Sequence, residues 1–210
     1  MCDTAPVSLE RPTTAGELRE QIWSNLVRQN QAAYPMPPHG HNPNFKGARA
    51  AAKNLMLHPV LKNAKVVLVG MEAALLALRE MILEAEKTLI VPHRTKKDVY
   101  WKLENVPKKA ARIGNFHLFG ASCDLKSVSC AVIASVIVDA RGYRLSKGFG
   151  WAAQGVPIEV PTFSVVHESM VLEKLEFAED SCLIGFATPT RLIICPNVEK
   201  TPSAHEFSQS

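Results

Sequence analysis

The sequence lacks several features that would place it in a special class of proteins. Its five cysteines include no C-x-x-C pair of the kind found in zinc and redox sites, and an odd count without a disulfide framework is typical of a reducing compartment. The longest apolar run, Cys130–Val138, is too short to cross a bilayer, and no apolar segment comes before Glu10 to suggest a secretory signal. We therefore expect a cytoplasmic protein without a membrane-spanning segment.

The sequence also has no large excess of one charge and no familiar ligand-binding fingerprint. The net charge of +4 over 210 residues is too mild to indicate a dedicated nucleic-acid binder, and neither a Walker A loop nor a Rossmann fingerprint is present. His39 and His41 have no third ligand at a suitable spacing, so no metal site is predicted. Basic and aromatic residues are interleaved from Arg94 to Lys109, and such a segment can bind single-stranded nucleic acid. We favour the alternative that it is a solvated loop lying over the active site.

What the chain does contain is enough apolar sequence, 47% of all residues, for one core of ordinary size. Thr14 begins a capping box, and apolar residues then recur at helical spacing. We expect helices from Thr14 to about Ala33, from Asn44 to Leu55, around Ala74–Ile82 and near Lys108–Arg112, and strands at Lys65–Val69, Thr88–Val91, Cys130–Val138, Thr162–Val166 and Arg191–Cys195. Residues 34–43 are expected to be an extended connector, residues 93–115 mostly irregular, and residues 1–13 and 197–210 disordered.

Strands that are apolar throughout, separated by amphipathic helices, indicate a mostly parallel sheet that is covered on both faces. The predicted fold is therefore a single three-layer α/β/α domain over residues 14–196. In such sheets, ligands bind beyond the carboxyl ends of the strands. This rule selects the loops after Val69, Val91, Val138 and Val166 as the functional edge.

A glycine-rich basic loop follows the most apolar run. Glycines allow backbone N–H groups to approach a ligand closely, and Arg144 and Lys147 add charge suited to phosphate oxygens around Gly148 and Gly150. The segment could cradle phosphate. A solvated glycine-rich turn would have the same composition, so both interpretations stay open on these residues alone.

The same segment resembles a family signature. G-Y-R-L-S-K-G-F-G-W, from Gly142 to Trp151, resembles the G-x-R-L-G-x-G-x-G-Y-Y-D motif of 5-formyltetrahydrofolate cyclo-ligases, also called methenyltetrahydrofolate synthetases. Lys87–Arg94 and Thr162–Glu168 resemble two strands of that family. T-P-T-R at 188–191, R-E-Q-I-W at 19–23 and P-N-F-K-G-A at 43–48 resemble its divergent domain-containing branch. The resemblance covers residues 15–196 and implies a NagB/RpiA/CoA-transferase-like fold.

The resemblance implies ATP, magnesium and a reduced folate as ligands, and conversion of 5-formyltetrahydrofolate to 5,10-methenyltetrahydrofolate as the reaction. The nucleotide-binding residues it implies are Arg144, Lys147, Gly148, Phe149, Gly150, Lys46 and Arg19. The substrate-binding residues it implies are Trp151, Glu72, Pro92, Arg94, His167 and Glu168. His167 and Glu168 form a possible base and orienter, although a structural hydrogen bond is the simpler interpretation.

Three positions depart from the family pattern. Its Tyr-Tyr-Asp is Trp151-Ala152-Ala153 here, the Thr that follows the family's Glu is Leu75, and one loop glycine is Ser146. The missing Asp belongs to the magnesium–phosphate end of the family's site, and magnesium held without a carboxylate is held weakly. We therefore predict small-molecule ligands, ATP and a reduced folate, and leave open whether the protein is a cyclo-ligase or a catalytically inactive binding or regulatory module. An RNA-associated role is the weakest alternative, and the oligomeric state is not predicted.

Overall fold

The computed structural model describes residues 11–196, so the tails expected at 1–13 and 197–210 lie outside it apart from residues 11–13. The α-helices are α1 Ala15–Arg28, α2 Ala48–Leu55, α3 Pro59–Asn63, α4 Leu76–Glu84 and α5 Phe116–Phe119. The short 3-10 helices are η1 Ala73–Leu75, η2 Lys108–Ala111, η3 Ile113–Asn115 and η4 Glu168–Met170. The strands are β1 Ala32–Ala33, β2 Asn44–Phe45, β3 Val66–Val69, β4 Thr88–Pro92, β5 Tyr100–Leu103, β6 Ala121–Cys123, β7 Cys130–Val132, β8 Ile137–Asp139, β9 Tyr143–Leu145, β10 Thr162–Val165, β11 Val171–Leu172, β12 Ser181–Cys182, β13 Gly185–Ala187 and β14 Leu192–Ile194.

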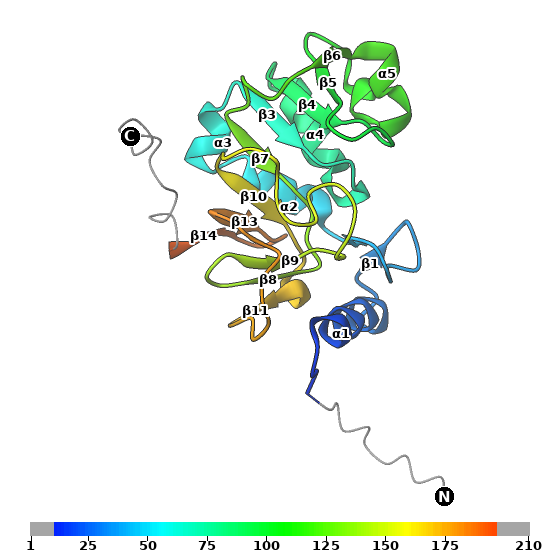
Figure 1. Ribbon diagram of the computed structural model, residues 1–210, viewed down its shortest axis with the longest axis vertical. Helices are drawn as coiled ribbons and strands as arrows, with labels where there is room; N and C mark the ends of the chain where they lie inside the picture. The colour runs from blue at the N-terminus through cyan, green and yellow to red at the C-terminus, as the bar shows by residue number, and fades with distance from the viewer. Residues whose placement is uncertain (1–10, 197–210) are drawn as a thin grey trace, which may run out of the picture.

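An eight-stranded sheet forms the centre of the molecule, in the order β14-β13-β10-β7-β3-β4-β5-β6 (Figure 1). Its five inner strands, from β13 to β4, are parallel to one another, whereas β14, β5 and β6 are antiparallel additions at the two edges. The predicted α/β fold with a mostly parallel central sheet is confirmed.

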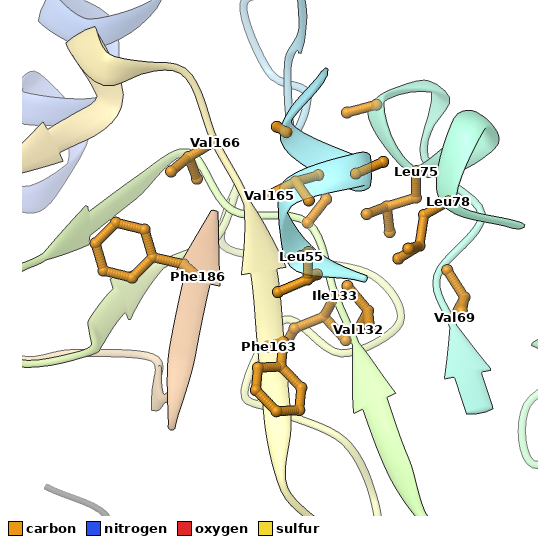
Figure 2. Close-up of a cluster of buried hydrophobic side chains, with 14 of the residues drawn as sticks. Leu55, Val69, Leu75, Leu78, Val132, Ile133, Phe163, Val165, Val166 and Phe186 are labelled. Atoms are coloured by element: carbon orange, nitrogen blue, oxygen red, sulfur yellow. The ribbon is translucent and has the colours of Figure 1, made fainter. Parts of the chain in front are cut away.

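The main core lies between this sheet and the helices. Figure 2 shows apolar side chains of the parallel strands, among them Val69, Val132 and Phe163, in one cluster with Leu55 of α2 and Leu78 of α4. These five side chains have almost no exposed surface. Fully burying one such side chain stabilises the fold by about 1.5–3 kcal/mol, so this layer supplies a large share of the driving force for folding.

The opposite face of the sheet has a smaller core. Leu68, Ile90 and Ala131 point to this side, where apolar residues of the stretches 123–128 and 156–160 cover them. No helical residue between positions 11 and 196 belongs to this smaller cluster. The second outer layer, which the sequence led us to expect as helices, is therefore made of extended chain.

The helices at the N-terminal side begin or end differently from the prediction. Thr14 does cap α1, because its hydroxyl accepts a hydrogen bond from the Glu17 N–H at 3.1 Å. The helix ends at Arg28 rather than near Ala33, since Asn30 adopts a left-handed conformation with φ 54°. The second helix starts at Ala48, because the preceding β2 pairs with β1 instead.

The apolar run Cys130–Val138 was expected to be one central strand, and that expectation is wrong. The chain leaves the large sheet after β7, and β8 belongs to a second, four-stranded sheet in the order β11-β8-β9-β12. The connecting residues are just as buried as the two strands, and the Val136 N–H already donates to the Leu145 carbonyl of the second sheet at 2.8 Å. Hydrophobicity alone contains no signal for such a break.

The basic segment 93–115 contains one element that was not expected. Strand β5 pairs with β4, with the side chains of Tyr100 and Leu103 buried. The expected short helix near Lys108 is present as η2. No helix within residues 11–196 is long and apolar enough to span a membrane.

Candidate functional site

The glycine-rich loop, residues 146–155, follows β9 of the small sheet and returns to the carboxyl end of β3 in the large one. Its Trp151 packs beside Gly70, the first residue after β3, where an added Cβ would lie 3.4 Å from the indole ring. The loop therefore reaches the edge that the parallel-sheet rule selects, although it starts from the other sheet.

Arg144 has a structural position in this loop and no exposed surface for a ligand. Its side chain is 1% exposed, and its guanidinium donates to the Ala134 carbonyl at 2.9 Å, the Ala152 carbonyl at 3.1 Å and the Ser181 hydroxyl at 2.8 Å. It also donates to the Ser135 hydroxyl at 3.2 Å. Burial lowers the pKa of Arg144 to about 10, which leaves it charged at neutral pH. The expected direct contact with phosphate is replaced by a role in holding the loop.

A second set of contacts holds the start of the loop. The Asp180 carboxylate accepts hydrogen bonds from the Ser146 N–H at 2.7 Å and from the Ser146 hydroxyl at 2.8 Å. Arg19 donates through Nε to the Ser146 carbonyl at 2.6 Å and through Nη2 to Asp180 at 3.2 Å. Arg19 is thus brought to the predicted loop, where it supports the backbone just before Gly148.

Asn42 joins the loop to the segment after β3. Its Oδ1 accepts a hydrogen bond from the Lys147 N–H at 2.9 Å, and its Nδ2 donates to the Glu72 Oε1 at 3.1 Å. The Gly148 N–H donates to the Ser146 hydroxyl at 2.9 Å. The N–H groups of Lys147 and Gly148 are therefore already satisfied within the protein.

The next part of the loop is open. Gly148, Phe149 and Gly150 are exposed, and the two glycines adopt positive φ values of 92° and 87°, which other residues rarely adopt. Within residues 11–196, the N–H groups of Phe149 and Gly150 have no hydrogen-bond partner. The Lys147 Nζ lies 4.5 Å from the centre of the exposed Phe149 ring. These two N–H groups and the lysine are the available anion-binding groups of the loop.

Two buried polar atoms beside Gly70 have no partner. Within the described part of the chain, the Glu72 Oε2 and the Trp151 Nε1 are inaccessible to solvent and make no hydrogen bond. The backbone that presents Glu72 is rigid, because the buried Arg79 donates to the Gly70 carbonyl at 2.6 Å and to the Glu72 carbonyl at 3.1 Å. Burial lowers the pKa of Arg79 to about 10. A buried acceptor on Glu72 and a buried donor on Trp151 therefore both remain without a partner among the described residues.

An open cleft of about 520 Å³ lies in front of Trp151. One wall is the turn after β4, with the exposed basic residues Arg94, Lys96 and Lys97, and the other wall is the chain from Gly150 to Pro157. Pro92, at the end of β4, is buried behind this turn. The structure thus brings Arg94 to the same cleft as Trp151.

His167, Glu168 and Lys46 lie apart from this cleft. Glu168 accepts hydrogen bonds from the Thr190 N–H at 3.1 Å and hydroxyl at 2.7 Å, and His167 packs its ring against Phe45. No hydrogen bond or ion pair within residues 11–196 links any of the three to the loop. The structural hydrogen bond favoured for His167 is present, because its Nδ1 accepts from the Ser169 N–H at 3.2 Å.

The residues present do not form a carboxylate site for magnesium. No group of three His, Cys, Asp or Glu side chains suited to a metal is found between residues 11 and 196. Asp180 is the acidic residue at the loop, but its Oδ2 already receives the Arg19 and Ser146 hydrogen bonds and its Oδ1 faces Gln154. A magnesium ion here would depend on phosphate oxygens and water for its ligands.

Sequence reasoning missed Asn42 and Asp180. Asn42 lies in the proline-rich connector, where composition predicts only irregular chain, and Asp180 lies far along the chain from the loop that it holds. Ser146 was noted only as a lost glycine, yet its hydroxyl connects Asp180 to the Gly148 N–H. No spacing pattern in a single sequence marks these contacts.

Comparisons with known proteins identify relatives of this chain. No protein-family model matches the chain. The chain is 30% identical over 200 residues to the methenyltetrahydrofolate synthase domain-containing protein of Homo sapiens, an alignment that covers 84% of this chain and 52% of the relative. The Bos taurus protein of the same name is 31% identical over 204 residues, covering 84% and 53%.

The chain therefore spans about half the length of the curated relatives it matches. A solved structure, the 5,10-methenyltetrahydrofolate synthetase of Aquifex aeolicus, superposes with a TM-score of 0.58 at 18% identity, covering 90% of this chain and 99% of that one. At this level of identity the superposition establishes a shared fold.

Proposed function

The chain belongs to the methenyltetrahydrofolate synthetase family, as a homologue of the methenyltetrahydrofolate synthase domain-containing proteins, and we propose that it binds ATP and a reduced folate beside Gly70. The folate ring would lie against Trp151 and Glu72, and the phosphates against the loop from Lys147 to Gly150. Both ligands follow from the family, and the arrangement of this chain's own residues supports them.

The observation that carries the proposal is the pair of buried atoms without partners, the Glu72 Oε2 and the Trp151 Nε1. Leaving a buried polar group unsatisfied costs about 1–3 kcal/mol, so proteins rarely retain one without a use. The pyrimidine half of a reduced pterin is flat and has N–H donors beside a carbonyl acceptor, which match a carboxylate oxygen and an indole N–H. The Trp151 ring can also stack on such a ligand.

Phosphate groups would bind at the other end of the site. Within residues 11–196 the N–H groups of Phe149 and Gly150 are unpartnered, and the Lys147 side chain lies beside both residues, 4.5 Å from the Phe149 ring centre and 3.8 Å from the position of a Cβ on Gly150. An exposed cation–π contact is worth about 0.5–1 kcal/mol, whereas a hydrogen bond to a charged group contributes about 1.5–3 kcal/mol. Moving the Lys147 Nζ from Phe149 to a phosphate is therefore favourable.

A second candidate function is ligand binding without turnover. Ala152 and Ala153 stand where the family signature continues to its carboxylate, and Asp180 is already fully engaged. The cyclo-ligase reaction requires transfer of the ATP γ-phosphoryl group to the formyl oxygen, followed by attack of N10 and loss of phosphate. Absorbance of the methenyl product, recorded with 5-formyltetrahydrofolate, ATP and magnesium, separates the two functions: product formation establishes the cyclo-ligase, and intact binding without product establishes the silent binding protein.

We also propose a cytoplasmic location and small-molecule ligands rather than RNA. The four described cysteines are all unpaired thiols, as expected in a reducing compartment. The basic residues Arg94, Lys96 and Lys97 line the same cleft as Trp151, which supports their use in binding the proposed ligand.

The first test is a lysine substitution in the loop. Replacement of Lys147 by Ala removes a charge-assisted contact to phosphate and should weaken ATP binding about tenfold or more, measured by isothermal titration calorimetry. Lys126→Ala is the matched control, because the Lys126 side chain is 91% exposed and lines neither the loop nor the cleft. Equal ATP affinities of the two variants would contradict the loop assignment, and an absence of ATP binding by the unmodified protein would contradict the proposed function.

A further inference from the structure

Asn42 occupies the junction between the two halves of the proposed site. It is 9% exposed, and both ends of its carboxamide are used, toward the Lys147 N–H and toward the Glu72 Oε1. The orientation of the amide is fixed by its partners, since a backbone N–H can only donate and a carboxylate can only accept. Asn42 therefore makes the direct polar connection between the phosphate loop and the Glu72 carboxylate.

We propose that Asn42 is a positioning residue that couples occupation of the folate half of the site to the geometry of the phosphate loop. The inference rests on the proposed function and extends it with a residue that touches neither ligand. The two groups it joins lie on different sheets, because Lys147 follows β9 and Glu72 follows β3. The contact between Asn42 and Lys147 spans 105 positions of the chain.

The coupling follows from how the Glu72 carboxylate is shared. Its Oε1 is held by Asn42, and its Oε2 is buried beside Gly70 without a partner in the described part of the chain. A ligand N–H that binds Oε2 fixes the plane of the carboxylate, and through Asn42 it fixes the backbone at Lys147. The unpartnered N–H groups of Phe149 and Gly150 follow directly in the chain, so their direction is set at the same time. By thermodynamic linkage, phosphate binding must then strengthen folate binding by the same factor.

The experiment measures the ATP affinity by calorimetry with and without saturating 5-formyltetrahydrofolate. We expect the folate to tighten ATP binding about fivefold or more in the unmodified protein and to have no effect in Asn42→Ala, since allosteric coupling factors start near that value. Asn63→Ala is the matched control, because Asn63 is exposed at the end of α3; it should retain the full coupling. A coupling factor that is unchanged in Asn42→Ala, or absent from the unmodified protein, overturns the inference.

Two further variants separate positioning from a general structural role. Asn42→Asp keeps an acceptor for the Lys147 N–H but places a second carboxylate against Glu72, which raises the pKa of one of the two. Folate affinity should then depend on pH more strongly than in the unmodified protein, because protonation of the carboxylate pair removes an acceptor. The double variant Asn42→Asp with Glu72→Gln restores one donor and one acceptor, and it should recover the coupling. If the variants lose thermal stability but show neither the pH dependence nor the recovered coupling, Asn42 has only a structural role.

Hydrogen exchange tests the contact between Asn42 and Lys147 without any ligand. Hydrogen exchange of the Lys147 amide should be about tenfold faster or more in Asn42→Ala, because the amide loses its acceptor, while the amides of β3 stay protected. Unchanged exchange at Lys147 would overturn the inference whatever the ligands are. Failure of the unmodified protein to bind ATP and folate, together with faster exchange, would instead reject the proposed function and retain the structural connection.

Discussion

Arg144 shows how burial changes the role of a residue whose type and spacing suggest a ligand contact. In sequence it stands three positions before Lys147 in a glycine-rich loop, and an arginine there is typical of a phosphate contact. In the structure its guanidinium is turned inward and joins carbonyl groups on both sides of the loop. The half-buried Lys147 and the unpartnered N–H groups of Phe149 and Gly150 are left as the groups of the loop that could bind an anion.

The placement of Arg144 is testable with a conservative substitution. Arg144→Lys keeps the charge but cannot reach Ala134, Ala152 and Ser181 together, so the free energy of unfolding should fall by about 2–3 kcal/mol. ATP affinity of the folded protein should change less than in Lys147→Ala. Urea denaturation and calorimetry measure the two effects, with the exposed Arg112→Lys as control. A large loss of ATP affinity with unchanged stability would show instead that Arg144 contacts phosphate directly.

Part of the site could be predicted residue by residue because the signal is local. The positive φ values of Gly142, Gly148 and Gly150 follow from a glycine-rich turn, and at Gly142 a side chain would collide with the Leu183 carbonyl. The roles of Asn42 and Asp180 could not be predicted, because each acts on a loop that is distant in the chain. Composition and spacing describe neighbours in sequence, whereas these contacts exist only after folding.

At the scale of elements, the β8–β9 hairpin carries the loop to the edge of the large sheet. Its turn is organised by Asp139, which is fully buried and accepts hydrogen bonds from the N–H groups of Arg141, Tyr143 and Leu175. The Arg141 guanidinium pairs with the same carboxylate at 2.6 Å. The position of the loop therefore depends on one acidic side chain between two strands.

Removing that carboxylate should loosen the small sheet. Asp139→Ala leaves several donors without an acceptor and should lower the free energy of unfolding by about 3 kcal/mol, measured by urea denaturation. Glu159→Ala, an exposed acidic residue, is the control and should change it by less than about 0.5 kcal/mol. Similar stabilities of the two variants would show that the turn is held by backbone contacts alone.

The elements of the large sheet were easier to predict than those of the small one. Strands β3, β4 and β10 are continuous apolar runs bounded by Gly, Pro or polar residues, and the sequence marks them within one residue. The break between β7 and β8 has no such boundary, because its residues are buried by both sheets. Strand β5 was hidden by its charged and aromatic residues, which suit an antiparallel strand whose middle residues are only partly buried.

At the scale of the whole molecule, the candidate site is assembled from segments that lie far apart in the chain. The hydrogen bonds that hold its loop span 127 positions from Arg19 to Ser146 and 105 from Asn42 to Lys147. Strands β3 and β4, in contrast, are joined by the single helical segment of η1 and α4. Long-range contacts close larger loops and form later in folding than local ones.

The site should therefore form after the sheet. In pulsed hydrogen exchange during refolding, the Ser146 and Lys147 amides should become protected later than the amides of β3 and β4. Destabilising the site by Asn42→Ala should then mainly speed unfolding and leave the folding rate nearly unchanged, because late contacts are absent from the transition state. Simultaneous protection of the loop and the sheet would contradict this order.

The two edges of the large sheet have a consequence for its behaviour in a crowded solution. Each edge strand, β6 and β14, has only three residues and runs antiparallel to its neighbour. An exposed edge offers unpaired backbone groups to other chains, and short edges limit how many can pair. The buried, apolar parallel strands are enclosed between these edge strands. The arrangement protects the apolar strands from intermolecular pairing while their carboxyl ends stay open for ligands.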